Sequence, residues 1–163
     1  MTNRESWWHD QTTTNYEFRK MEPEELSTFE PFLAEGFRRI WGEAFSEETL
    51  EVARNKINTR ALLVIFIREK GSESSAPQAF ITIKMVDDFG MLSVSVEDGF
   101  NTWNKEDDVL AEGLAFCKHF ARVVGANYVQ FSSTRQGWRK VAPKLGYRLK
   151  FIKDGREHYS TGV

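Results

Sequence analysis

Residues 107–125 constrain the fold more than any other stretch, because they combine a wide apolar stripe with clear start and stop signals. Apolar side chains recur at intervals of four and three residues in two neighbouring rows: Leu110, Leu114, Cys117, Ala121 and Val124, and Val109, Gly113, Phe116, Phe120 and Val123. Rows with this spacing share one face of an α-helix. Asp107 or Asp108 can cap the helix start, and Gly125 can end it in the left-handed conformation. The sequence therefore predicts a long helix with a broad buried face.

The segments on either side of this helix are typical of strands. Leu92, Val94 and Val96 alternate with serines before it, and Val129 and Phe131 alternate with polar residues after it. A strand, an acidic loop, a long helix and a second strand in succession predict a crossover unit in a sheet.

The rest of the chain supplies further elements of both kinds. Periodic apolar residues predict helices at 22–41, 46–59 and 136–146, and strands at 16–20, 62–67, 79–85, 92–96 and 147–151, with a hairpin return at 156–159. The run 62–67 is continuously apolar, as in a strand covered on both faces. The strands from 62 to 96 are joined by turns, so we expect a three-stranded meander.

Size and charge limit the protein's class. A chain of 163 residues fits one domain, which we place at 16–163. A net charge of −2, from 22 basic and 24 acidic residues, gives no global attraction to nucleic acid or anionic membranes. The sequence contains no apolar run of about 18 residues and no signal-peptide pattern, so we expect neither a membrane span nor secretion. Cys117 is the single cysteine and falls on the apolar helix face, which predicts a core thiol in a cytoplasmic, reducing compartment.

The first 15 residues form a polar arm without periodicity, yet they contain Trp7 and Trp8 side by side. Each indole offers on the order of 200 Å² of surface that is unfavourable to leave in water. The pair can fold back onto its own domain or anchor the arm on another chain. We favour the second hypothesis, self-association or binding of a protein partner through the arm.

A local basic cluster and three histidines are the other candidates for binding. Arg135, Arg139 and Lys140, with Lys144 nearby, surround Trp138. They are either a solvated helix face or a docking surface for an acidic partner or a phosphate backbone. The histidines at 9, 119 and 158 lack the spacing of metal ligands, so we expect no metal site.

The order of these elements resembles that of the GNAT acetyltransferase superfamily, over roughly residues 16–159. The long helix after the fourth strand and the ending APKLGY at 142–147 add to the resemblance. It implies an α/β fold with a mixed, mostly antiparallel sheet flanked by helices on both faces, and acetyl-CoA as the cofactor.

The family's cofactor loop does not match this sequence. The family holds the pyrophosphate of coenzyme A in a loop of pattern Gln/Arg-x-x-Gly-x-Gly/Ala, whereas residues 97–108 contain Gly99 as their only glycine. The same residues include five carboxylates and one lysine, Lys105. At about 5 Å and an effective dielectric of about 20, each carboxylate repels a phosphate charge by roughly 3 kcal/mol before screening. We therefore predict that acetyl-CoA does not bind.

The family's catalytic groups are matched only in part. The tyrosine that often protonates the departing thiolate would fall at Ala142, and Tyr147 resembles the family's packing aromatic. A general base could come from Glu97 or Asp98, at the end of the fourth strand. We therefore predict a catalytically degenerate GNAT-like module with a structural or interaction role, such as a phage virion or accessory component. The alternative is an active N-acetyltransferase that uses Glu97 and Asp98 on an amine.

Overall fold

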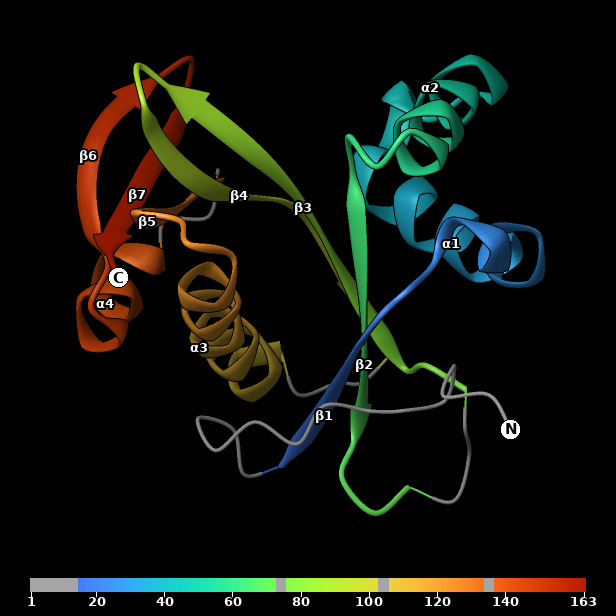
Figure 1. The fold of residues 1–163 in the computed structure, drawn as a ribbon, viewed down its shortest axis with the longest axis horizontal. Coiled ribbons are helices and arrows are strands. Elements are labelled where there is room, and N and C mark those ends of the chain that lie inside the picture. The colour runs from blue at the N-terminus through green and yellow to red at the C-terminus, as the bar shows by residue number, and fades with distance from the viewer. Residues whose placement is uncertain (1–14, 73–75, 103–105, 134–136) are drawn as a thin grey trace.

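The computed structural model describes residues 15–72, 76–102, 106–133 and 137–163 (Figure 1). The arm with Trp7 and Trp8 lies outside these ranges, as does Arg135. The hypotheses about these residues therefore stay predictions. Among the described residues, every helix is too short or too polar to cross a bilayer.

The described strands form one seven-stranded sheet in the order β1-β2-β3-β4-β5-β7-β6. They are β1 (Tyr16–Lys20), β2 (Leu63–Glu69), β3 (Ala79–Asp88), β4 (Met91–Asn101), β5 (Tyr128–Ser133), β6 (Arg148–Lys153) and β7 (Arg156–Gly162). All neighbours run antiparallel except β4 and β5, which are parallel and joined by a helix. The predicted mixed, mostly antiparallel sheet is confirmed, and so are the meander β2-β3-β4 and the crossover from β4 to β5.

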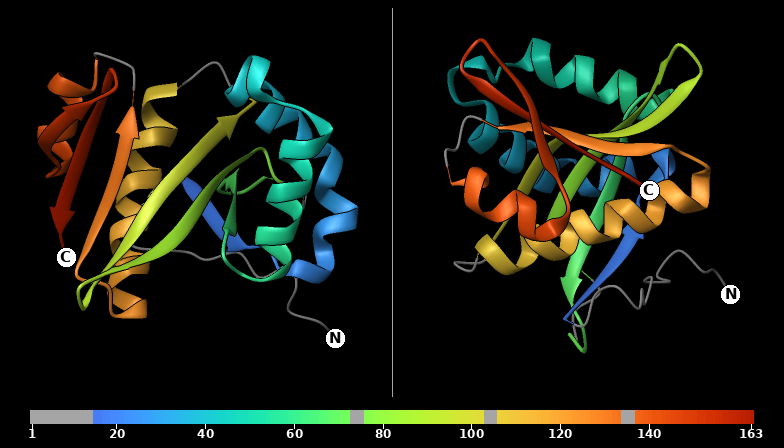
Figure 2. Two further views of the ribbon diagram at one scale, coloured as in Figure 1. Left: turned by 90° about the horizontal axis from the view of Figure 1, so that it is seen from above. Right: turned by 90° about the vertical axis from the view of Figure 1, so that its left-hand side faces the viewer.

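Helices cover both faces of the sheet, as expected. They are η1 (Pro23–Glu25), α1 (Leu26–Trp41), η2 (Gly42–Ala44), α2 (Glu47–Asn58), α3 (Glu106–Val124), α4 (Trp138–Val141) and η3 (Ala142–Leu145). Figure 2 shows α1 and α2 on one side of β3 and β4 and α3 on the other. Ser46 caps α2 by accepting a hydrogen bond from the Thr49 N–H at 3.1 Å, and Gly125 ends α3 with a φ of +78°.

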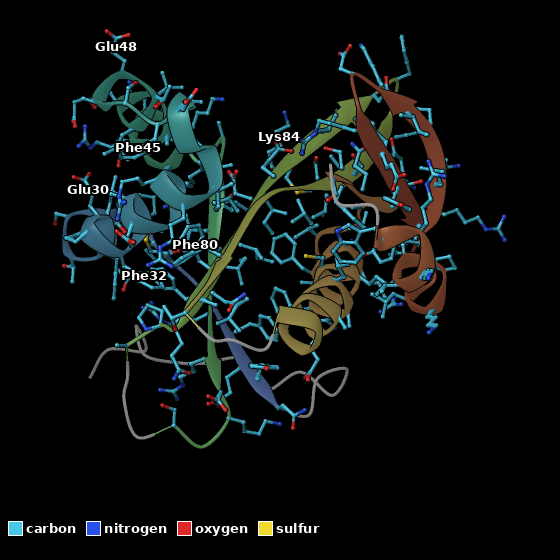
Figure 3. All side chains as sticks on the ribbon, turned by 180° about the vertical axis from the view of Figure 1, so that it is seen from behind. Glu30, Phe32, Phe45, Glu48, Phe80 and Lys84 are labelled. Carbon is cyan, nitrogen blue, oxygen red and sulfur yellow. The ribbon has the colours of Figure 1, made fainter. Side chains whose placement is uncertain are left out.

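The sheet separates two apolar cores. Val64 and Phe66 of β2 face α1 and α2, while Ile65 and Ile67 face the core that contains α3. The continuous apolar run of β2 is therefore buried on both sides, as predicted. On the α1 side, Phe32 and Phe80 meet edge to face with ring centroids 5.7 Å apart (Figure 3).

Two predicted boundaries are wrong. The fourth strand was expected to end at Val96, but β4 continues to Asn101 because residues 98–101 pair with β3. The predicted hairpin return at 156–159 is present as β7, but it continues to Gly162 and inserts between β5 and β6. All six residues of β6 are exposed, so the alternation of Leu149 and Phe151 does not mark a buried face.

Candidate functional site

A bulge in β4 brings two carboxylates onto the same face of the sheet. Ile83 pairs with Val96 and Thr82 pairs with Asp98, which leaves Glu97 as an extra residue in β4. Regular alternation would send consecutive side chains to opposite faces, whereas a bulge redirects one of them. Glu97 and Asp98 therefore both lie on the face covered by α1 and α2, and both belong to a strand rather than to the loop that we expected.

The Asp98 carboxylate is held by donors from two other elements. Trp41 Nε1, at the end of α1, donates to Oδ1 at 3.1 Å, and Thr82 Oγ1 of β3 donates to Oδ2 at 3.0 Å. Burial raises the pKa of Asp98, and these two hydrogen bonds oppose the rise. The neighbouring Glu97 charge adds to the rise and the more distant Arg156 opposes it. Asp98 is thus a stronger base than an ordinary aspartate.

Glu97 has a more polar environment than Asp98. Ser95 Oγ donates to Glu97 Oε2 at 2.7 Å, and Lys84 Nζ lies 3.5 Å from Glu97 Oε1. About a third of the Glu97 side chain is exposed, so water reaches this carboxylate. The site therefore places a partly exposed carboxylate beside a buried one.

The two carboxylates lie where β4 and β5 part. Among the described residues, parallel pairing runs from Ser93 to Val96 on β4, and Ser132 and Ser133 of β5 pair only with β7. Residues 98–101 of β4 therefore pair with β3 on one side, and on the other side they pair with no described strand. Arg156 of β7 donates from Nε to Ser132 Oγ at 3.1 Å, and its charge acts on Asp98.

The position expected for a proton donor has no hydroxyl. Ala142 is fully buried in the core under α3. Tyr147 is fully buried too, and its hydroxyl donates to the Leu114 carbonyl at 3.2 Å. Burial raises the pKa of Tyr147. Tyr147 is a packing aromatic, as predicted.

Three of the residues predicted to bind a partner, Trp138, Arg139 and Lys140, lie in the described part of the chain. Trp138 is partly buried against Phe131, with ring centroids 4.9 Å apart. Arg139 forms an ion pair with Glu157, whose pKa is lowered by the Tyr159 hydroxyl and by Arg139. Lys140 is exposed.

The described residues His158 and Cys117 pack against other side chains of the fold. His158 stacks on Phe151 at 4.3 Å, and among the described residues no three His, Cys, Asp or Glu side chains gather as metal ligands would. Cys117 is fully buried, as predicted, and burial raises its pKa to about 12.

Sequence reasoning missed Trp41, Thr82 and Arg156 as parts of the site. Trp41 was assigned only to a helical stripe, although a tryptophan at a helix end carries an N–H that needs a partner. No local signal marked Thr82 or Arg156, because the bulge and the insertion of β7 bring them to Asp98.

No protein-family model and no curated protein matches this sequence, whereas solved structures share its fold. A GNAT family acetyltransferase from Listeria monocytogenes has a TM-score of 0.65 and 8% identity, over 90% of this chain and 95% of that one. Aminoglycoside 6'-acetyltransferase type Ii has a TM-score of 0.68 and 10% identity, over 89% and 96%. The PaiA N-acetyltransferase from Thermoplasma acidophilum, in complex with coenzyme A, has a TM-score of 0.59 and 14% identity, over 92% and 100%. The chain has the GNAT fold, as predicted.

Proposed function

We propose that the protein is a GNAT-type N-acyltransferase that moves an acyl group from an acyl-CoA to an amine, with Asp98 as the general base. One observation carries this proposal: the β4 bulge presents Asp98, with a raised pKa, at the opening between β4 and β5. The similarity to acetyltransferase structures, one of them bound to coenzyme A, supports the same chemistry.

The role of the protein in this reaction is to remove a proton from the amine. A primary amine has a pKa near 10 and is mostly protonated at neutral pH, so it must lose a proton before it attacks a carbonyl carbon. The carboxylates of Glu97 and Asp98 attract the ammonium, and Asp98 takes the proton directly or through a water molecule. The new C–N bond then replaces the C–S bond of the thioester. Ala142 offers no proton, and none is essential, because thiols ionise near a pKa of about 8.5 and water can protonate the departing sulfur.

Some residues near the site favour binding of an acyl-CoA, and others oppose it. The open edge of β4 can hydrogen-bond the amide groups of such a donor, as a neighbouring strand would. The start of α3, in contrast, carries Glu106, Asp107 and Asp108 in place of glycines. These carboxylates disfavour pyrophosphate, so the proposal implies weak binding of coenzyme A.

A second candidate is a catalytically degenerate binding module, and two features favour it. The acidic start of α3 opposes the cofactor's phosphates, and the buried Ala142 replaces the proton donor. Such a module would act in structure or interaction, for example in a phage particle.

Binding and turnover separate the two candidates. Acetyl-CoA would be titrated into the full chain by calorimetry, and transfer to a panel of primary amines would be followed by release of free thiol. We expect saturable binding at millimolar concentration and measurable transfer. Asp98→Asn should lower kcat/KM by about 10²-fold or more, the range for a general base. Asp88→Asn is the matched control, because Asp88 is exposed beside the β3–β4 turn and should leave the rate unchanged.

The other possible results of these two experiments also distinguish the acyltransferase from the binding module. Saturable binding without transfer to any amine would favour the binding module. The absence of both binding and transfer would refute the acyltransferase proposal, and so would transfer that Asp98→Asn leaves unchanged.

A further inference from the structure

One end of the molecule carries cations without acidic partners, in a chain whose net charge is −2. Most described arginines elsewhere are paired: Arg19 with Glu25, Arg54 with Glu30, Arg68 with Glu17, and Arg139 with Glu157. Around the start of β6, Arg148 and Lys150 have no hydrogen-bond or ion-pair partner among the described residues. Exposed charges without partners are common, but here they border a cavity.

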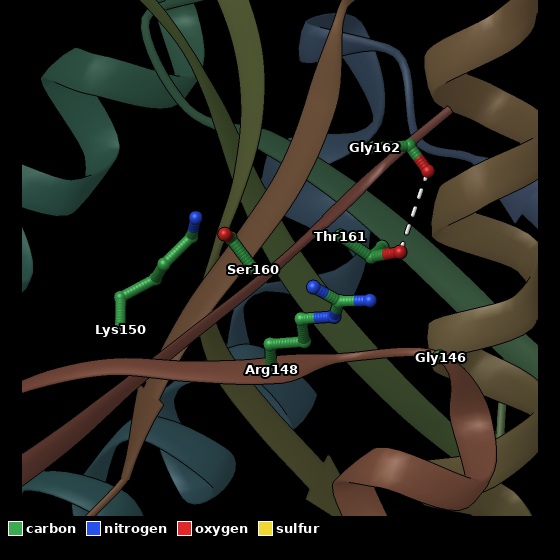
Figure 4. A pocket seen from close by; sticks show the side chains of 6 residues that line it. All are labelled: Gly146, Arg148, Lys150, Ser160, Thr161 and Gly162. Atoms are coloured by element: carbon green, nitrogen blue, oxygen red, sulfur yellow. Dashed lines mark hydrogen bonds between the residues drawn. The ribbon is translucent and has the colours of Figure 1, made fainter.

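The cavity lies on the β6–β7 hairpin and has a volume of about 330 Å³. Its lining consists of Gly146, Arg148, Lys150, Ser160, Thr161 and Gly162 (Figure 4). Arg148 and Ser160 are paired across β6 and β7, so strand register holds the guanidinium beside a hydroxyl. The lining offers two cations and two hydroxyls and contains no carboxylate.

A third cation, Lys118 of α3, lies beside Gly146, which is one of the residues that line the cavity. Lys118 Nζ donates to the Leu145 carbonyl at 2.6 Å, and a Cβ added at Gly146 would lie 2.7 Å from the same nitrogen. The ammonium therefore lies close to Gly146, whose φ of +86° favours glycine. Burial lowers the pKa of Lys118, and the nearby Arg122 lowers it further. An anion in the cavity would relieve this excess of positive charge.

We propose that this cavity binds the phosphate groups of a small polyphosphorylated ligand. Guanidinium and ammonium groups with hydroxyl donors are the groups that proteins use for phosphate oxygens. Each phosphate carries about −1.5 to −2 charges near neutral pH, so the three cations match two linked phosphates better than one carboxylate. The volume of about 330 Å³ admits a group of this size.

The cavity is separate from the candidate acyl-transfer site. The charge of Arg156, at one end of β7, acts on Asp98, and Thr161 lines the cavity near the other end. Thr161 follows Arg156 by five positions along the strand, which corresponds to about 17 Å. The proposal therefore does not depend on acyl transfer, and its outcome is independent of the acetyl-CoA titration.

Sodium tripolyphosphate is the probe for this site. It would be titrated into the full chain by calorimetry and by NMR amide shifts, at an ionic strength held constant with sodium chloride. We expect saturable binding, with the largest shifts at the amides of Gly146, Ser160, Thr161 and Gly162. The double variant Arg148→Gln/Lys150→Gln should bind at least tenfold more weakly.

The matched control is Lys56→Gln/Arg60→Gln, which removes the same two charges from exposed positions at the end of α2. It should change the affinity less than twofold, and thermal unfolding would show that both variants fold. Equal weakening in both variants would mean general charge attraction and would overturn the proposal. Shifts confined to other residues would overturn it as well, and so would no saturation at 10 mM probe, which is about four orders of magnitude above a micromolar dissociation constant.

Discussion

Replacing Gly36 by alanine tests the closest approach of α1 to the sheet. A Cβ at this position would lie 2.4 and 2.6 Å from Cε2 and Cζ of Phe80, and 3.0 Å from Cδ2 of Phe100. Favourable carbon–carbon contacts are about 3.5–4.0 Å, so the overlap is about 1 Å. Phe80 is fully buried, and its ring also contacts the rings of Phe32 and Phe37. It therefore has little room to rotate away.

Two opposing effects determine how much Gly36→Ala changes the free energy of unfolding. Alanine favours a helix over glycine by about 1 kcal/mol. Overpacking a filled core costs typically about 1–3 kcal/mol, and the enclosed Phe80 ring places Gly36→Ala at the upper end. We therefore expect Gly36→Ala to lower the free energy of unfolding by about 2 kcal/mol, the difference between these two values.

Gly113→Ala is the control within α3, because a Cβ added there meets nothing within 4 Å. Only the higher helix preference of alanine then acts, so the free energy of unfolding of this variant should rise by up to about 1 kcal/mol. Urea unfolding followed by circular dichroism would measure both values, and the melting temperature of Gly36→Ala should fall by about 4–8 °C. If Gly36→Ala is as stable as the parent, the contact between α1 and Phe80 is looser than described, and the reasoning fails.

Three further predictions concern the cores and the candidate site. Cys117 is buried with a pKa of about 12, so a bulky thiol reagent should label it only after unfolding, and rapid labelling of the folded protein would contradict its placement. Tyr147→Phe removes the hydrogen bond to the Leu114 carbonyl and should cost about 1 kcal/mol in urea unfolding, whereas an unchanged midpoint would show that this bond contributes nothing. The pKa of Asp98 is raised above 3.8 in the folded state, so the native protein binds more protons and this group's contribution to stability is lost as pH rises through the folded pKa. Asp98→Asn should therefore gain stability relative to the parent as pH rises over that range, and a difference that is constant with pH would show that the pKa is not raised.

Local patterns in the sequence were sufficient to predict the helices and most strands. The rows of α3, the Ser46 cap of α2 and the continuous apolar run of β2 each depend on residues within a few positions of one another. Burial of one helix face or of both strand faces follows from such spacing wherever the element packs. The succession of elements then allowed the GNAT fold to be predicted before any contact was known.

The site depended on contacts between distant parts of the chain. Trp41 and Thr82 meet at Asp98, and Arg156 adds its charge, although 115 positions separate Trp41 from Arg156. Nothing within a few residues of Glu97 shows that β3 and β4 shift register there, since a bulge depends on how two strands pair. The sequence by itself therefore determined the positions of the helices and most strands, and the buried faces of α3 and β2. The tertiary structure alone decided that Glu97 and Asp98 share one face, because strand register and the insertion of β7 follow from the packing of the whole sheet.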